Sequence, residues 1–106
     1  MVTVNAKIWL ERDSRFVLGE GRAELLRRVR ETGSLAAAAR SMGMAYSHAW
    51  AEVQAISEAA GGSVVETAAG GKRGGGSKLT ELGERLLDRF DDEMRGMDAH
   101  LAHRNR

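Results

Sequence analysis

The sequence contains no cysteine and no long apolar run, and these absences remove several classes of protein. Without cysteine the chain can form no disulfide, has no thiol nucleophile and offers no thiolate ligand to zinc. It lacks the run of about 18 apolar residues that a transmembrane helix needs, and its first residues lack the pattern of a signal peptide. We therefore expect a soluble, cytoplasmic protein with no membrane partner.

The sequence also has almost no excess of charge of either sign, because the net charge of the 106 residues is only +1. This total neither supports nor excludes nucleic acid as a partner, so the distribution matters more. Five arginines and two glutamates lie between residues 21 and 40, whereas seven acidic residues lie between 81 and 98. We expect the acidic C-terminal part to face solvent or a partner, while the rest of a single small domain faces phosphates.

Hydrophobic periodicity predicts a strand and then three helices. Apolar residues alternate with polar ones over residues 2–11, as in a half-buried edge strand. The period then changes to that of a helix, which Gly33 ends, and Ser34 can cap a short second helix. Gly43 makes a tight turn, and a third helix is expected over about residues 45–60.

The remainder predicts two short strands and a long last helix. Val64-Val65 and Lys78-Leu79 flank a glycine-rich segment, and Thr80 can cap a helix that runs roughly 30 Å from residue 81 to 101. A small domain cannot cover the whole apolar stripe of that helix, so we expect a second copy of the chain to cover it. We expect a winged domain over residues 1–79 and a dimerisation helix over 80–106, with the contact residues Leu86, Phe90, Met94, Met97 and Leu101.

This order of elements predicts a winged helix-turn-helix, a mostly α fold with a small β wing (α+β). The glycine-rich segment does not fit a phosphate-binding P-loop, because Gly76 is followed by Ser77-Lys78 rather than by lysine and then serine or threonine at the start of a helix. A flexible linker would explain the glycines but not Lys72, Arg73 and Lys78 among them. A wing that carries cations to the sugar-phosphate backbone or a narrow minor groove explains both.

Three motifs occur together in the chain: a Tyr-x-x-Ala-Trp helix, a Gly-Gly-Lys-x-Gly-Gly-Gly wing and a Leu-Thr-x-x-Gly helix start. With their neighbours, the residues are Gly33-Ser34-Leu35, Ala38-Ala39, Gly43-Met44-Ala45-Tyr46, Ala49-Trp50, Gly70-Gly71-Lys72, Gly74-Gly75-Gly76, Leu79-Thr80, Gly83 and Leu86. In this combination the chain resembles the N-terminal DNA-binding domain of the ModE family of molybdate-responsive regulators, which is related to the DNA-binding domains of LysR-type regulators. The resemblance implies a winged helix, a homodimer and a palindromic operator.

This sequence also departs from the family. The family has a basic residue where this chain has Ser47 and an arginine where it has Thr67, so the DNA sequence preference of the family is not carried over. The molybdate-binding C-terminal domains of the full regulator have no counterpart in these residues, so the chain either stands alone or is a fragment. We expect no cofactor, and no effector site is evident in the sequence.

Candidate contacts to double-stranded DNA lie in three places. They are Ser34 at the start of the second helix, Tyr46, Ser47 and His48 at the start of the third, and Lys72, Arg73 and Lys78 in the wing. Capping by Ser34 or Ser47 is the alternative for those two, and Trp50 is expected to pack against the wing or the first strand. Nothing predicts an enzyme or a metal site, since His100 and His103 lack a third ligand.

Three functions remain open from the sequence. The first is sequence-specific regulation of transcription by a DNA-binding homodimer. The second is RNA binding, because Arg73-Gly74-Gly75 is a single RGG triplet, although five aromatic residues offer little for base stacking. The third is a dimerisation or adaptor module without DNA specificity.

Overall fold

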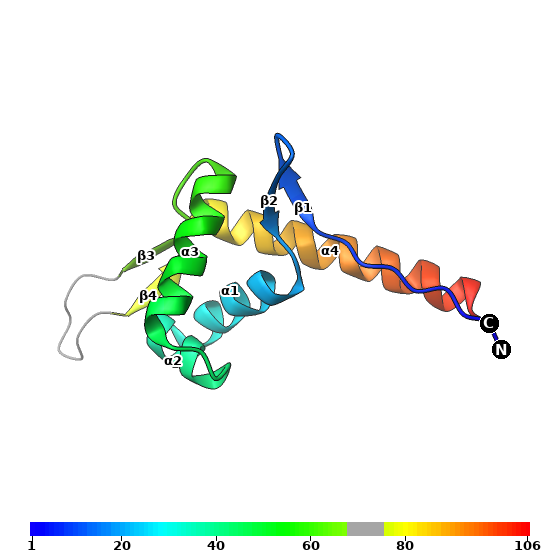
Figure 1. Cartoon of the computed structure of the whole chain (residues 1–106), viewed down its shortest axis with the longest axis horizontal. Coiled ribbons are helices and arrows are strands. Elements are labelled where there is room, and N and C mark those ends of the chain that lie inside the picture. The colour runs from blue at the N-terminus through cyan, green and yellow to red at the C-terminus, as the bar shows by residue number, and fades with distance from the viewer. Residues whose placement is uncertain (68–75) are drawn as a thin grey trace.

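A computed structural model describes residues 1–67 and 76–106 of the chain, and its architecture is a winged helix-turn-helix, mostly α with a small β wing. Apart from β2, which was not predicted, the elements follow one another in the predicted order (Figure 1). They are β1 (Leu10–Arg12), β2 (Arg15–Leu18), α1 (Glu20–Thr32), α2 (Leu35–Ser41), α3 (Tyr46–Ala60), β3 (Val65–Thr67), β4 (Ser77–Leu79) and α4 (Glu81–Arg104). Among the described residues, no helix has the length and apolar character to cross a membrane.

The predicted strand over residues 2–11 is wrong for most of its length. Residues 1–9 form no strand and run alongside α4 (Figure 1), where Asn105 receives a hydrogen bond from Val4 N and donates one to Val4 O, both at 2.9 Å. Val2 and Val4 are exposed. The alternating pattern misleads here because a strand needs another strand to pair its backbone, and these residues have a helix as their neighbour.

Pairing begins only at Leu10, in a hairpin of β1 and β2 that the sequence pattern did not predict. Asp13 and Ser14 form the turn with φ angles of 51° and 66°, which are typical of a two-residue hairpin loop. The usual signal for such a loop contains glycine, and Asp-Ser does not. The hairpin delivers Val17 and Leu18 to the core, where both are buried.

The predicted helix ends are confirmed. Gly33 caps α1 in the left-handed conformation with a φ of 69°. Ser34 Oγ accepts a hydrogen bond from Ala37 N at 3.0 Å at the start of α2, and Thr80 Oγ1 accepts one from Gly83 N at 3.0 Å at the start of α4. These caps fix where each helix begins and therefore how the three-helix unit turns.

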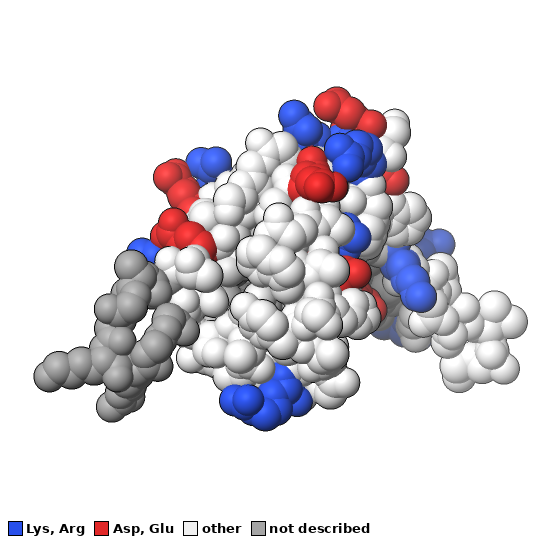
Figure 2. Space-filling model, turned by 60° about the vertical axis from the view of Figure 1, so that its left-hand side comes forward, with Lys and Arg blue, Asp and Glu red and all other residues white. Residues whose placement is uncertain are grey.

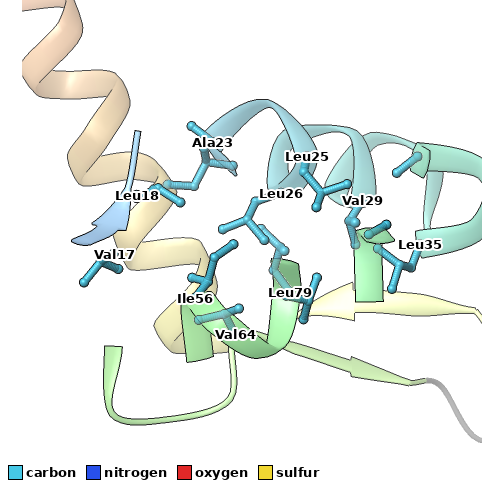
Figure 3. Close-up of a cluster of buried hydrophobic side chains, with 14 of the residues drawn as sticks. Val17, Leu18, Ala23, Leu25, Leu26, Val29, Leu35, Ile56, Val64 and Leu79 are labelled. Atoms are coloured by element: carbon cyan, nitrogen blue, oxygen red, sulfur yellow. The ribbon is translucent and has the colours of Figure 1, made fainter. Parts of the chain in front are cut away.

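One hydrophobic core joins β2, all four helices and the wing strands (Figure 3). Small residues allow close packing where α2 meets the rest, since Ala38 and Ala39 are almost fully buried. Leu26, Ile56 and Val64 are fully buried at the centre, between α1, α3 and the segment before β3. This core holds α3 so that its opposite face points outward.

The wing consists of β3 and β4, which pair antiparallel with Val65 opposite Leu79 and Thr67 opposite Ser77. A hydrogen bond of 2.8 Å from Ser77 N to Gly33 O ties the base of the wing to the turn between α1 and α2. Lys72 and Arg73, which we predict to contact DNA, lie outside the described residues.

The long helix α4 leaves the globular part and gives the molecule extents of 55 × 30 × 21 Å (Figure 1). Its first half joins the core of the same protomer, because Leu87 is fully buried and Phe90 is only 2% exposed. Phe90 therefore occupies the core rather than a free dimerisation surface. Further along, Met94, Met97 and Leu101 remain half-buried.

The acidic residues of α4 pair with the arginines of α1 instead of facing only solvent or a partner, as the sequence suggested. Arg27 Nη2 lies 2.6 Å from Asp91 Oδ1, and Arg30 Nη1 lies 3.0 Å from Glu84 Oε2. Within α1, hydrogen bonds from Arg28 and Arg27 lower the pKa of Glu24. These side chains are partly exposed, so each pair contributes at most about 1 kcal/mol to the stability of the fold. Together the pairs orient α4 against α1.

Candidate nucleic-acid interface

The outer face of α3 is a row of exposed, uncharged side chains. Ser47, Ala51 and Gln54 follow one another at intervals of four and three residues and are all exposed. Residues at this spacing lie on one face of a helix. Ala49 and Val53 occupy the opposite face and are buried in the core. The α3 helix therefore presents its first two turns to a ligand outside the domain.

The start of α3 explains why Ser47 belongs to this face. Gly43 turns the chain with a φ of 67°, and Ala45 is the N-cap of α3 without a side-chain hydrogen bond. Ser47 is therefore the second residue of the helix and not its cap, which removes the capping alternative for this residue. Its hydroxyl group can donate or accept a hydrogen bond at the exposed face.

Aromatic residues border the outer face of α3 on the side of the wing. Tyr46 and Trp50 are 54% and 46% exposed and line a hollow of about 300 Å³ with Thr67 and Ser77 of the wing strands. Trp50, which we expected to pack against the wing or the first strand, lines this hollow beside the wing strands, and about half of its side chain remains accessible. Leu35, at the start of α2, lines the same hollow.

His48 lies on the other border of the outer face. Its side chain is 63% exposed, and its Nε2 is 3.9 Å from Glu52 Oε1. Glu52 also receives a hydrogen bond of 3.0 Å from Arg22 Nε, which connects this side of α3 to the start of α1. His48 is thus separated from Tyr46 and Trp50 by the row of residues that begins with Ser47.

Two further predicted contact residues lie near the aromatic hollow. Ser34 is half-buried and directly precedes Leu35, and its hydroxyl oxygen is used as the cap of α2. Lys78 Nζ is 3.4 Å from Glu66 Oε1 on the paired strand, and both side chains are largely exposed. An exposed pair of this kind is weak, so the ammonium group of Lys78 remains available to another anion.

Few charged side chains lie in the middle of the face of the molecule that Figure 2 shows. Figure 2 shows an uncharged surface across the centre, beside the segment drawn in grey, with Lys and Arg at the lower edge. The arginines of α1 do not add to this surface as free cations, because Arg27, Arg28 and Arg30 form ion pairs with acidic residues. Both cations and carboxylates lie at the margins of this surface in Figure 2, whereas its uncharged centre suits contacts to bases.

Sequence reasoning missed Ala51 and Gln54, although a signal for them was present. Both lie at helical spacing from Ser47 and opposite the apolar stripe that contains Val53. The prediction from the sequence covered only the first turn of this helix.

In the described parts, 1–67 and 76–106, no three His, Asp or Glu side chains are arranged to hold a metal ion.

A short helix, a glycine turn, an exposed second helix and an adjoining two-stranded wing define a winged helix-turn-helix, which is a class of DNA-binding domain. The sequence model of the bacterial regulatory helix-turn-helix proteins of the lysR family matches residues 22–84, from α1 to the start of α4. The chain belongs to this family of DNA-binding transcription regulators.

Relatives with established names match 66% of the chain. The chain is 46% identical over 70 residues to the molybdenum-pterin-binding protein MopB of Rhodobacter capsulatus. It is 39% identical to the transcriptional regulator ModE of Yersinia pestis and 36% identical to the DNA-binding transcriptional dual regulator ModE of Escherichia coli, again over 70 residues. The matched segment spans only 26% of MopB and 27% of each ModE protein.

Proposed function

We propose that the chain binds double-stranded DNA in a sequence-specific manner and regulates transcription, with α3 in the major groove. The observation that carries this proposal is the exposed row on α3. Gln54 has the carboxamide that pairs with adenine, Ala51 has the methyl group that contacts thymine, and Ser47 has a hydroxyl group that can donate or accept.

Contacts to the DNA backbone surround this row in the proposed complex. Tyr46 and Ser34 lie on the side of the wing, and Lys78 leads into the segment that contains Lys72 and Arg73. Hydroxyl groups and cations are the usual protein partners of phosphate oxygens. His48, at the opposite border, can donate a hydrogen bond to a guanine or to a phosphate.

We further propose that the DNA-binding form is a homodimer joined through the second half of α4. Met94 packs against the edge of the protomer's core, whereas Met97 and Leu101 continue the stripe beyond it. The N-terminal segment, in which Val2 and Val4 are exposed, runs alongside the same helix (Figure 1). A two-fold dimer would bury this surface and present two copies of α3 to major grooves about 34–36 Å apart. The ModE relatives are named transcriptional regulators, which supports a regulatory role for this chain.

The experiment that tests this function starts from a random pool of DNA duplexes. Selection with the purified chain, followed by titration of the enriched duplex, a scrambled duplex and a single-stranded RNA at two salt concentrations, separates the three functions. We expect one enriched palindromic motif that is bound about 10³-fold or more tightly than the scrambled duplex. Preference for the RNA would identify an RNA-binding protein, and binding to none of the three would leave the adaptor module.

A further inference from the structure

A second pocket lies between α1 and α3, and His48, one of the proposed DNA contacts, borders it. It has a volume of about 450 Å³, and its walls include Phe16 of β2, Leu25 of α1 and the pair Met42 and Met44 between α2 and α3. On α3 it is flanked by His48 and Glu52, whereas the aromatic hollow is flanked by Trp50 and Gln54. The volume is within the range of sites for small molecules, roughly 300–1,000 Å³. We call it the α1–α3 pocket.

The polar groups of the α1–α3 pocket favour a cation. Two carboxylates, those of Glu20 and Glu52, line it, and Arg22 is the only Lys or Arg side chain that the described part of the chain contributes to its lining. The guanidinium group of Arg22 is already occupied, since it donates to Glu52 at 3.0 Å, to Phe16 O at 3.2 Å and to Val17 O at 3.1 Å. Within the described residues, Glu20 has no ion-pair partner.

We propose that the α1–α3 pocket binds a small organic cation with an apolar body, such as a primary amine that carries an aromatic ring. The ring would contact Met42, Met44 and Leu25, since thioether sulfur packs favourably against aromatic rings. The ammonium group would lie between the carboxylates of Glu20 and Glu52, where it is paired without displacing Arg22.

Such a ligand would act on α3, because two residues of the pocket belong to that helix. Glu52 is joined to α1 through Arg22, and His48 borders the proposed DNA-contacting row. A ligand held between α1 and α3 would therefore favour one position of α3 and change the affinity for DNA. This coupling rests on the proposed function, whereas the binding of an amine to the pocket does not.

The methionines provide a direct readout of occupancy. Two of the five, Met42 and Met44, line the pocket, while Met1, Met94 and Met97 lie elsewhere in the chain. In the full chain with ¹³C-labelled methionine methyl groups, phenethylamine should cause saturable shifts of the Met42 and Met44 signals only. The anion 3-phenylpropionate, of similar size, should bind at least several-fold more weakly at the same ionic strength. Glu20→Gln should weaken the binding of phenethylamine about twofold to fivefold, as expected for a partly exposed charge pair.

A blocking variant and a matched control are available. Gly21 lines the pocket, and a Cβ atom added there meets no heavy atom within 4 Å, so Gly21→Leu can fill the space without a clash at the backbone. Gly96 of α4 is equally open, which makes Gly96→Leu the control. The Met42 and Met44 shifts should disappear in Gly21→Leu and persist in Gly96→Leu.

Any of the following results would overturn the proposal: no saturable shift of Met42 and Met44 with the amine, equal or stronger binding of the anion, or shifts that survive in Gly21→Leu. Shifts of these two signals that depend on protein concentration without any amine would also overturn it, since they would assign the pocket to a second copy of the chain. For the coupling, saturating phenethylamine should change operator affinity at least threefold in the unmodified chain and not in Gly21→Leu. If the chain binds no DNA, the methyl shifts still decide whether the pocket binds the amine.

Discussion

At Gly83, in the first turns of α4, the fold leaves no room for a side chain. A Cβ atom placed there would lie 2.2 Å from the carbonyl oxygen of Val64 and 3.4 Å from Leu79 Cβ. The same carbonyl oxygen accepts a hydrogen bond of 3.0 Å from Thr80 N. The glycine therefore allows α4 to begin directly against the segment that leads into β3, and this explains its place in the Leu-Thr-x-x-Gly motif.

The substitution Gly83→Ala should destabilise the chain by about 2–4 kcal/mol, because backbone must move to admit the methyl group. Gly96→Ala is the matched control in the same helix, where a Cβ atom meets nothing within 4 Å. It should be neutral or stabilise by up to about 1 kcal/mol, as alanine favours helices. Urea unfolding followed by circular dichroism measures both. Equal stabilities of the two variants would show that α4 can shift away from Val64 at little cost.

At the exposed face of α3, Gln54 carries the clearest prediction about DNA sequence. Gln54→Ala should reduce discrimination at one base pair of the selected operator by about 1–3 kcal/mol and leave binding to scrambled DNA nearly unchanged. Titration of operators mutated at each position measures this. A uniform loss on all sequences would instead make Gln54 a backbone contact.

For His48 we expect the same kind of change in operator preference, because it can donate to a guanine. His48→Ala should alter the preferred operator more than it alters non-specific affinity, with a cost of about 1–3 kcal/mol at one position. His48 lies at the border of the exposed row of α3, however, and its side chain is near Glu52. If specific and non-specific affinities fall together, His48 contacts phosphate.

Among the elements, we propose that the wing contacts DNA through more than its two strands. The described part of the wing offers one cation, Lys78, which pairs weakly with Glu66 across the strands. The predicted cations Lys72 and Arg73 add two more in the intervening segment. Each cation that neutralises a phosphate makes binding more sensitive to salt, because it releases counterions from the DNA.

Removing wing cations should therefore reduce affinity on every sequence and flatten its salt dependence. Lys78→Ala should lower the slope of log affinity against log salt by about one unit, and Lys72→Ala with Arg73→Ala by about two. Fluorescence anisotropy on operator and scrambled duplexes over a range of salt concentrations measures both slopes. An unchanged slope in the double variant would show that the glycine-rich segment does not contact DNA.

At the scale of the whole molecule, the prediction concerns the second half of α4. The substitution Phe90→Asp would not test dimerisation, because Phe90 is part of the protomer's own core and a buried charge there would unfold the domain. Met97 and Leu101 lie beyond that core and are only half-buried. They are the appropriate positions for a test of the proposed dimer.

The double variant Met97→Asp with Leu101→Asp should give a folded monomer with strongly reduced operator affinity. The control Ala99→Asp with Ala102→Asp adds the same charge at exposed positions of the same helix and should remain dimeric. Light scattering measures the mass, and circular dichroism confirms the fold. A monomeric mass for the unmodified chain at high micromolar concentration would contradict the dimer and leave the α4 stripe to another partner.

The sequence by itself determined the helices, their caps and the order of the helices along the chain, because these depend on neighbours within a few residues. Gly33, Ser34 and Thr80 act locally, so their residue types were sufficient to place the ends of three helices. The motifs around Tyr46 and Trp50 were likewise sufficient to indicate the family, because they lie close together in the chain.

Only the tertiary structure decided which surfaces are free and which are covered. The alternating residues before Leu10 look like a strand, but a strand needs a partner strand, and residues 1–67 and 76–106 provide none beside them. Phe90 and Met97 belong to the same apolar stripe, yet only the packing of α1 and α4 buries the first and leaves the second accessible. Pairing and burial depend on residues far away in the chain, and local pattern carries no information about them.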